Sequence, residues 1–335
     1  MATTHIFGAV VLLASAALAP ATPAVDSGAA RAQGATLANA SVAPPSDTLK
    51  VVLLGTAPGP LVNLQQYGAS ILVEAGGQRF LFDCGRGATL RLAQAGVPIR
   101  SITRVFLTHL HSDHVIQLPD LLLAGWSGGR YAVPLTVWGP AGTGAMMQHL
   151  LEAFDFDIRM RRDVDEHFPA PGITVVSHDI TGDSVVVAEN GLTITAFLVD
   201  HGVVRPAFGY RVDYRGRSVV LSGDTRASEN LIRHARGVDV LVHEVIDPVT
   251  LRNRADRPSA ATVDAIIAHH TTPEEAGTVF RRVAPRLAVY SHAPNNARVL
   301  AQTRTTYNGP LEGAEDLLTI FIGAEIRVEH HIAPP

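Results

Sequence analysis

The sequence predicts an α/β protein in which two mixed β-sheets pack face to face, with helices on their outer faces. Two observations lead to this fold class. Short β-prone runs come in two blocks, and helical patterns follow each block. No linker-like segment separates the blocks, so we expect a single domain over residues 49–335.

The first block contains apolar runs with Gly-containing turns between them, at residues 49–55, 69–75, 79–83 and 103–108. We expect helices over residues 87–96 and 118–124. A strand at 135–139, a helix at 146–154 and an irregular section with mixed charges then follow.

The second block begins with strands at residues 191–200, 208–214 and 217–224. Helices are expected at 226–235 and 272–284, with strands at 239–244 and 286–291. The second of these helices has a capping box at its start, with Thr272 as N-cap and Glu275 three residues later. Its apolar residues recur at helical spacing and are expected to face the core: Ala276, Val279, Phe280 and Val283.

Composition limits the classes of function. The 335 residues carry a formal net charge of −4 with no strongly basic half, so the clustered Lys and Arg of a generic nucleic-acid surface are missing. The single cysteine, Cys84, excludes an intramolecular disulfide and a multi-cysteine zinc site. It ends an apolar run, FLFDC, and is expected to be a small buried packing residue.

The N-terminus has the features of a secretory signal, apart from a basic start. Residues 6–19 form an apolar run shorter than the roughly 20 residues of a membrane span, and small-residue A-x-A sites follow. We expect a signal peptide over residues 1–32, cleaved after Ala32, and a flexible lead-in over 33–48. The mature protein is then periplasmic or secreted, without a membrane span; a cytoplasmic protein is the alternative.

The segment THLHSDH, residues 108–114, is the strongest functional signal. Alternate residues of a strand share a face, so His109 and His111 point the same way, and Asp113 and His114 follow from the turn beyond. Buried polar groups without partners cost about 2 to 7 kcal/mol each, so a metal ion is expected there. Imidazole and carboxylate are zinc ligands, and the density of donors argues against a merely solvated turn.

Further donors stand where other apolar runs end. Each is weak evidence by itself, because an acid after a strand is usually a turn residue, but their repetition predicts convergence at one rim. They are Asp200, His201, Asp224, His243, Glu244 and His292. His178 also follows a strand and competes with His201.

In order along the chain, THLHSDH, VDHG, LSGDT, VHEV, HHTTPEEAG and VYSH resemble the metallo-β-lactamase superfamily, in its branch of ribonuclease Z and the arylsulfatases. The likeness runs from about Leu49 to the final strands. It implies an αββα sandwich with a dinuclear zinc centre, for which Mn²⁺ or Fe are substitutes. It implies one zinc held by His109, His111 and His201, a second held by Asp113, His114 and His292, and Asp224 as the bridge.

Two motifs of the resemblance concern protons. VHEV is similar to the HEAT motif of the ribonuclease Z branch and HTT, at 270–272, to its HST motif. This implies that His270, helped by Glu244, protonates the leaving group, with adjacent His269 as a competitor. Gln117 stands where the family usually has Gly, so packing or pocket shape near the second metal is expected to differ.

Two zinc ions lower the pKa of a bound water to about 7 and polarise the oxygen under attack, which predicts hydrolysis by a metal-bound hydroxide that Asp113 orients. We expect a metal-dependent hydrolase of small anionic esters, either phosphodiesters or aryl sulfates. The alternatives are a ribonuclease Z-type tRNA 3′-endonuclease, a β-lactam-hydrolysing enzyme and a non-catalytic zinc-binding scaffold.

Nucleic acid is not the favoured partner, because the chain has no long Gly-, Pro- and Lys-rich arm. The three arginines of the irregular section are followed directly in the sequence by three acidic residues, which offset their charge. The arginines are Arg159, Arg161 and Arg162, and the acidic residues are Asp163, Asp165 and Glu166. A homodimer stays open as an oligomeric state. Trp126 is expected in the core, with the mouth of the pocket as the alternative.

Overall fold

The computed structural model describes residues 47–255 and 258–331. The expected signal peptide and the lead-in up to residue 46 lie outside the described residues, and the expected domain boundaries stay a prediction. Over the described ranges we find no helix with both the length and the apolar character needed to cross a bilayer.

The strands of the described residues form two mixed sheets. One contains β1 (Leu49–Gly55), β2 (Ser70–Ala75), β3 (Gln78–Phe82), β4 (Arg104–Phe106), β5 (Leu135–Pro140), β6 (Val175–Ile180), β14 (Thr319–Ile322) and β15 (Ile326–Glu329). The other contains β7 (Ser184–Glu189), β8 (Leu192–Leu198), β9 (Phe208–Tyr214), β10 (Arg217–Leu221), β11 (Val240–His243), β12 (Leu287–Tyr290) and β13 (Leu311–Glu312). Their strand orders are β15-β14-β1-β2-β3-β4-β5-β6 and β13-β12-β11-β10-β9-β8-β7.

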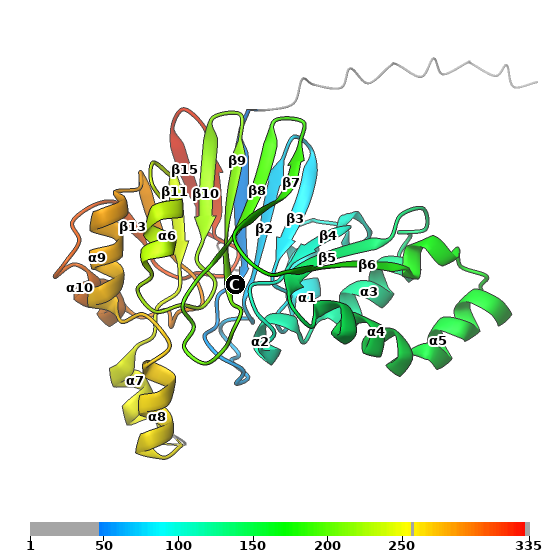
Figure 1. Ribbon diagram of the computed structural model, residues 1–335, viewed down its shortest axis with the longest axis horizontal. Helices are drawn as coiled ribbons and strands as arrows, with labels where there is room; N and C mark the ends of the chain where they lie inside the picture. The colour runs from blue at the N-terminus through cyan, green and yellow to red at the C-terminus, as the bar shows by residue number, and fades with distance from the viewer. Residues whose placement is uncertain (1–46, 256–257, 332–335) are drawn as a thin grey trace, which may run out of the picture. The chain divides into compact units, whose positions relative to one another are not determined.

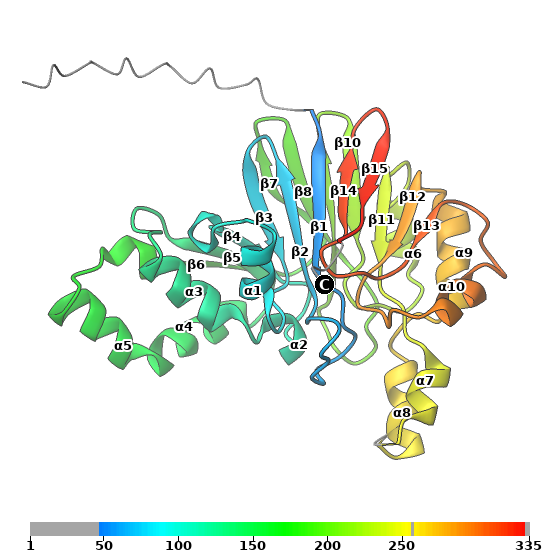
Figure 2. The same ribbon diagram turned by 180° about the vertical axis from the view of Figure 1, so that it is seen from behind.

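Both sheets combine antiparallel and parallel neighbours. In the first, β1 pairs antiparallel with β2 and β14, whereas β3, β4, β5 and β6 run parallel to one another. In the second, β8, β9 and β10 are antiparallel, and β10 to β13 are parallel. Figures 1 and 2 show the two sheets stacked face to face, as the sequence predicted.

Strand β1 is apolar at every position except Lys50, and its burial explains why. Val51 and Leu53 point between the two sheets, whereas Val52 and Leu54 point to the helix layer, because successive side chains of a strand alternate in direction. All four are at most 2% exposed, and full burial of such a side chain contributes about 1.5 to 3 kcal/mol. A strand buried on both faces holds its end firmly, and such ends carry the site.

Helices cover both outer faces. They are α1 (Ala88–Gln94), α2 (Ser112–Val115), α3 (Leu118–Ser127), α4 (Thr143–Ala153), α5 (Asp155–Arg159), α6 (Glu229–His234), α7 (Pro248–Asn253), α8 (Ala260–Ile267), α9 (Pro273–Val283) and α10 (Ala297–Thr303). Shorter turns are the 3₁₀ segments Ile99–Ser101 and Ala170–Ile173 and a π-helical turn, Met160–Val164. Helices α1, α3 and α4 pack on the first sheet, and α6, α9 and α10 on the second. In both figures α7 and α8 project away from the sheets.

Several local predictions are confirmed. The capping box of Thr272 and Glu275 starts α9, whose predicted apolar face is buried, and Cys84 is fully buried with a free thiol. Helix α6 begins three residues later than predicted, because the Ser228 hydroxyl accepts a hydrogen bond from the backbone N–H of Leu231 and caps it there.

The section expected to be irregular contains two strands, β6 and β7. The apolar run before His178 predicted a strand there, and β6 extends that strand through His178. Strand β7 was not predicted, because most of its side chains are exposed or half-buried. His178 lies in β6 and stacks on Trp138, with the ring centroids 5.1 Å apart.

Candidate metal centre

All seven residues that the resemblance assigned to metal ligation converge at one end of the sandwich, where strands of both sheets end. Two lie in the turn between β4 and α2, two lie in α2 itself, and the others follow β8, β10 and β12. They are His109, His111, Asp113, His114, His201, Asp224 and His292. His109, Asp224 and His292 stand within three residues of the strand ends that position them.

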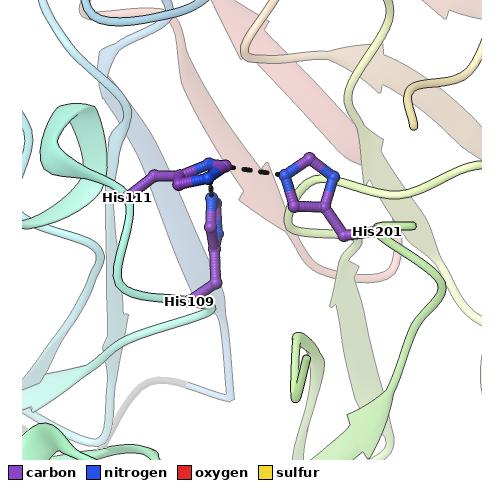
Figure 3. Close-up of side chains that lie close together, drawn as sticks. All are labelled: His109, His111 and His201. Atoms are coloured by element: carbon purple, nitrogen blue, oxygen red, sulfur yellow. Dashed lines mark hydrogen bonds between the residues drawn. The ribbon is translucent and has the colours of Figure 1, made fainter. Parts of the chain in front are cut away.

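One group consists of His109, His111 and His201, whose rings face one another in Figure 3. Nε2 of His109 lies 3.0 Å from Nδ1 of His111, and Nε2 of His201 lies 3.5 Å from the same atom. His109 and His201 are fully buried, whereas His111 is exposed. The exposed ring marks the side from which solvent reaches the group.

A second group consists of Asp113, His114 and His292. Oδ2 of Asp113 lies 3.2 Å from Nε2 of His292 and 3.6 Å from Nε2 of His114. Asp224 adjoins both groups: its Oδ2 is 3.4 Å from Nε2 of His114 and 3.9 Å from Nε2 of His109. This is the arrangement that the resemblance implied.

The donors fit divalent metal ions. Among the described residues, Nε2 of His114, Oδ1 of Asp224 and Nδ1 of His292 are buried without a hydrogen-bond partner. An unsatisfied buried polar group costs about 1 to 3 kcal/mol, and more when it is charged. Imidazole nitrogens and carboxylate oxygens are ligands that zinc takes, so two ions held here would remove this penalty.

Three of the donors have lowered pKa values, and this favours metal binding. Burial lowers the pKa of His109 well below its usual value and that of His201 to about 4. Burial alone would raise the pKa of Asp113, but its hydrogen bond with His292 and the nearby imidazolium charges lower it to about 2. A proton competes with a metal for the same lone pair, so these groups are free to ligate at neutral pH.

Asp83 is a site residue that the sequence analysis missed. Its Oδ2 lies 2.7 Å from Nδ1 of His114, and its Oδ1 accepts a hydrogen bond of 2.8 Å from the backbone N–H of Thr108. The carboxylate thereby turns Nε2 of His114 toward Asp224. Burial alone would lower the pKa of His114, but Asp224 and Asp83 raise it well above its usual value. The sequence signal that could have identified Asp83 is its position as an acidic residue at the end of the apolar run FLFD.

Glu244 and His270 form a pair beside the donors. Oε1 of Glu244 lies 3.2 Å from Nδ1 of His270 and accepts backbone hydrogen bonds of 3.1 Å from Thr225 and from Thr271. Burial alone would lower the pKa of His270, but the Glu244 charge and hydrogen bond raise it to about 9. A ligating atom of His270 lies within 4.8 Å of one on Asp224. Both residues therefore lie where the sequence predicted.

Other candidates take supporting positions. The backbone carbonyl of His269 lies 2.9 Å from Nδ1 of His201 and orients that ring. Nδ1 of His243 contacts the Glu244 carbonyl at 2.6 Å, and Asp200 pairs with Arg226 at 2.5 Å. These contacts direct His243 and Asp200 away from the donor groups.

Gln117 braces the polypeptide behind the site. Its Oε1 accepts a hydrogen bond of 2.9 Å from the Gly87 N–H, and its Nε2 donates one of 2.8 Å to Asp120. Gln117, where the family usually has Gly, thus connects the start of α1 to the start of α3. Trp126 is fully buried and donates to the Pro169 carbonyl at 2.9 Å, so the alternative of a pocket-mouth position is wrong.

Comparison with known proteins agrees with this geometry. Residues 78–293 match the family described as "Beta-lactamase superfamily domain". The ribonuclease Z of Mycolicibacterium gilvum (strain PYR-GCK) is 35% identical over 282 residues, which cover 80% of this chain and 94% of that protein. This chain belongs to the metallo-β-lactamase superfamily, in its ribonuclease Z branch. It is therefore a metal-dependent hydrolase by family.

Solved structures show the same fold. Human tRNase Z, short form, superposes with a TM-score of 0.62 at 21% identity, over 82% of this chain and 99% of that one. Zn²⁺-bound PqqB from Methylobacterium extorquens superposes with a TM-score of 0.59 at 17% identity, over 81% and 99%. The predicted αββα metallo-β-lactamase sandwich is confirmed.

Proposed function

We propose that this protein is a ribonuclease Z-type endonuclease that hydrolyses a phosphodiester bond at the 3′ end of precursor tRNA. The observation that carries the proposal is the Glu244–His270 pair beside the donor groups, at 3.2 Å. The 35% identity to a ribonuclease Z over most of both chains supports the same reading. This reverses the preference for small anionic esters, which rested on the expected secretion signal and on the missing Gly-, Pro- and Lys-rich arm.

The residues that would hold the metals are the two groups described above, with Asp224 between them. Two divalent cations bound there supply Lewis acidity and lower the pKa of a nearby water. The Asp113 carboxylate lies at the second group and would orient the attacking water by accepting a hydrogen bond from it.

His270 has the opposite task. Its Nδ1 is engaged by Glu244, so Nε2 is the atom left to give a proton to the leaving oxygen. Glu244 is itself 2% exposed and tied to two backbone N–H groups, so the imidazole is held in one orientation. The fold therefore separates the group that assists attack from the group that assists departure.

The test uses metal-replete protein and a precursor tRNA with a 3′ trailer, analysed on a sequencing gel. We expect cleavage at a single position that chelation abolishes and zinc restores. Zinc content by mass spectrometry should be about two per chain, as expected for a dinuclear site. Intact RNA, in protein that hydrolyses bis-p-nitrophenyl phosphate, would contradict the tRNA proposal. Nitrocefin tests the β-lactam alternative in the same series.

A second candidate is hydrolysis of small anionic esters, phosphodiesters or aryl sulfates. The paired arginines of α5 and of the π-helical turn after it favour this candidate: Arg159 with Asp155 at 2.8 Å, Arg161 with Asp157 at 3.0 Å and Arg162 with Asp163 at 2.7 Å. Arginines neutralised in this way have less charge to offer an RNA backbone, on which affinity for nucleic acid depends.

The compartment separates the two candidates. Precursor tRNA is made in the cytoplasm. Cleavage of a signal peptide after Ala32 would place the protein outside that compartment. N-terminal sequencing of protein from its native host measures this. A mature end at Gln33 supports the small-ester candidate, and an intact N-terminus supports the tRNA candidate.

A further inference from the structure

A cavity of about 470 Å³ opens directly beside the donor groups. His270 and His292 line it, together with residues of the loop after β1, of helices α7 and α8 and of the segments after β11 and β12. Most of the wall side chains are apolar, including Leu61, Val245, Ile246, Leu251, Ile266 and Pro294. An apolar chamber against a polar catalytic cluster is the usual form of a small-ligand site.

The wall formed by α7 is fixed by one buried carboxylate. Asp247 is 3% exposed and caps α7, accepting hydrogen bonds of 3.0 and 3.1 Å from the backbone N–H groups of Val249 and Thr250. Arg298 and Asn296, at the start of α10, also donate to its Oδ2. Because its polar groups bond to one another, the wall is formed before a ligand arrives.

The position of His270 indicates which part of a substrate enters. A smaller cavity of about 260 Å³, on the other side of the loop after β1, is lined by Asp113 together with Ser112 and Arg86. In phosphoryl transfer the attacking and leaving oxygens lie roughly in line across phosphorus. With Asp113 at one cavity and His270 at the other, the leaving group departs toward the larger cavity.

We propose that the larger cavity binds an aromatic ring carried by the leaving group of the substrate. This rests on the proposed function in one respect, the assignment of His270 to the leaving oxygen. A cavity of roughly 150 Å³ already binds benzene, so about 470 Å³ holds one or two fused rings with part of a sugar. A nucleobase of RNA and the aryl group of a small ester share this chemistry.

The test fills the cavity without touching the donors. Leu251 and Ile266 line it, are half-buried and lie outside the three core clusters, so Leu251→Trp and Ile266→Trp should fold. Val249→Trp is the matched control, because Val249 is on the same helix as Leu251, is 38% exposed and is not part of the cavity wall. Thermal melting and zinc content verify the fold of all three variants.

Binding of p-nitrophenol, measured by equilibrium dialysis, gives the first readout. We expect the wild type and Val249→Trp to bind alike, and both cavity-filling variants to bind about tenfold more weakly, a difference of roughly 1.4 kcal/mol. Equal binding by all of these proteins would overturn the proposal. This readout does not depend on turnover, so a protein that binds the ring but cleaves no phosphodiester contradicts only the proposed function.

Kinetics identify the source of the ring. A raised KM for precursor tRNA in Leu251→Trp supports a nucleobase, and a raised KM for bis-p-nitrophenyl phosphate alone supports a small aryl ester. Unchanged KM for both substrates in both cavity-filling variants would overturn the assignment of the cavity to the leaving group.

Discussion

The two walls around His270 are built in different ways. On one side the donor groups stand on the ends of strands buried in the sandwich. On the other, the cavity wall is a pair of short helices, α7 and α8, between Glu244 and His270 in the chain. The comparison teaches that the reactive groups come from the ends of strands in the buried sandwich, and the contacts proposed for selectivity from helices that project from it. Each prediction below tests one side of this division.

The largest effect is expected from Asp224→Ala. The carboxylate adjoins both donor groups, so its loss should remove bound zinc and reduce turnover to background, with both measured on the same sample. Asp200→Ala is the control, because Asp200 also follows a strand but pairs with Arg226 at the surface. Full zinc content in Asp224→Ala would show that the donor side does not depend on this bridge.

His270→Ala should separate chemistry from metal binding. We expect both zinc ions to remain and kcat to fall by about 10²- to 10⁴-fold, the usual contribution of a general acid. Glu244→Gln should give a smaller loss, since the amide can still accept a hydrogen bond from His270 but carries no charge. Zinc loss equal to that of Asp224→Ala would contradict this division of roles.

Asp83→Ala should weaken metal binding without abolishing it. The carboxylate orients His114 through its Nδ1, and removal of such a partner usually costs about 10- to 100-fold in metal affinity. Titration with a competing chelator measures the change. An unaltered zinc affinity would mean that Thr108 and the backbone suffice to hold the ring.

The smallest effect on the site is expected from Gln117→Gly, which restores the residue that the family usually has. Loss of its hydrogen bonds to Gly87 and Asp120 should lower the free energy of unfolding by about 1 to 3 kcal/mol, with zinc content and KM unchanged. Urea denaturation measures the first quantity. A changed KM would show that the brace also shapes the pocket.

The donor side could be predicted from the sequence because its residues follow strong strand patterns in an order that resembles a known family. That pattern left His178 and His201 as rivals, since both follow apolar runs. The resemblance favoured His201, and the tertiary structure agrees: His201 faces His111, whereas His178 stacks on Trp138. Asp83 was missed because one acid after a strand is indistinguishable from a turn residue.

The cavity could not be predicted in the same way. Its walls come from segments far apart in the chain, such as Leu61, Leu251 and Pro294, and each of these is ordinary in its local pattern. An enclosed volume depends on how α7 and α8 are tilted against the loop after β1, and sequence periodicity carries no information on that angle. Strand β7 was missed for a related reason, because little of it is buried.

The anchoring of α7 through Asp247 has a consequence for how this protein can diversify. The helical pair is one continuous stretch of polypeptide, secured at its base to α10 and flanked by the two residues assigned to proton delivery. Such a stretch can be replaced as one segment of sequence. New substrate preferences can then arise by replacing about twenty residues, while the hydrolytic machinery inherited from the sandwich stays intact.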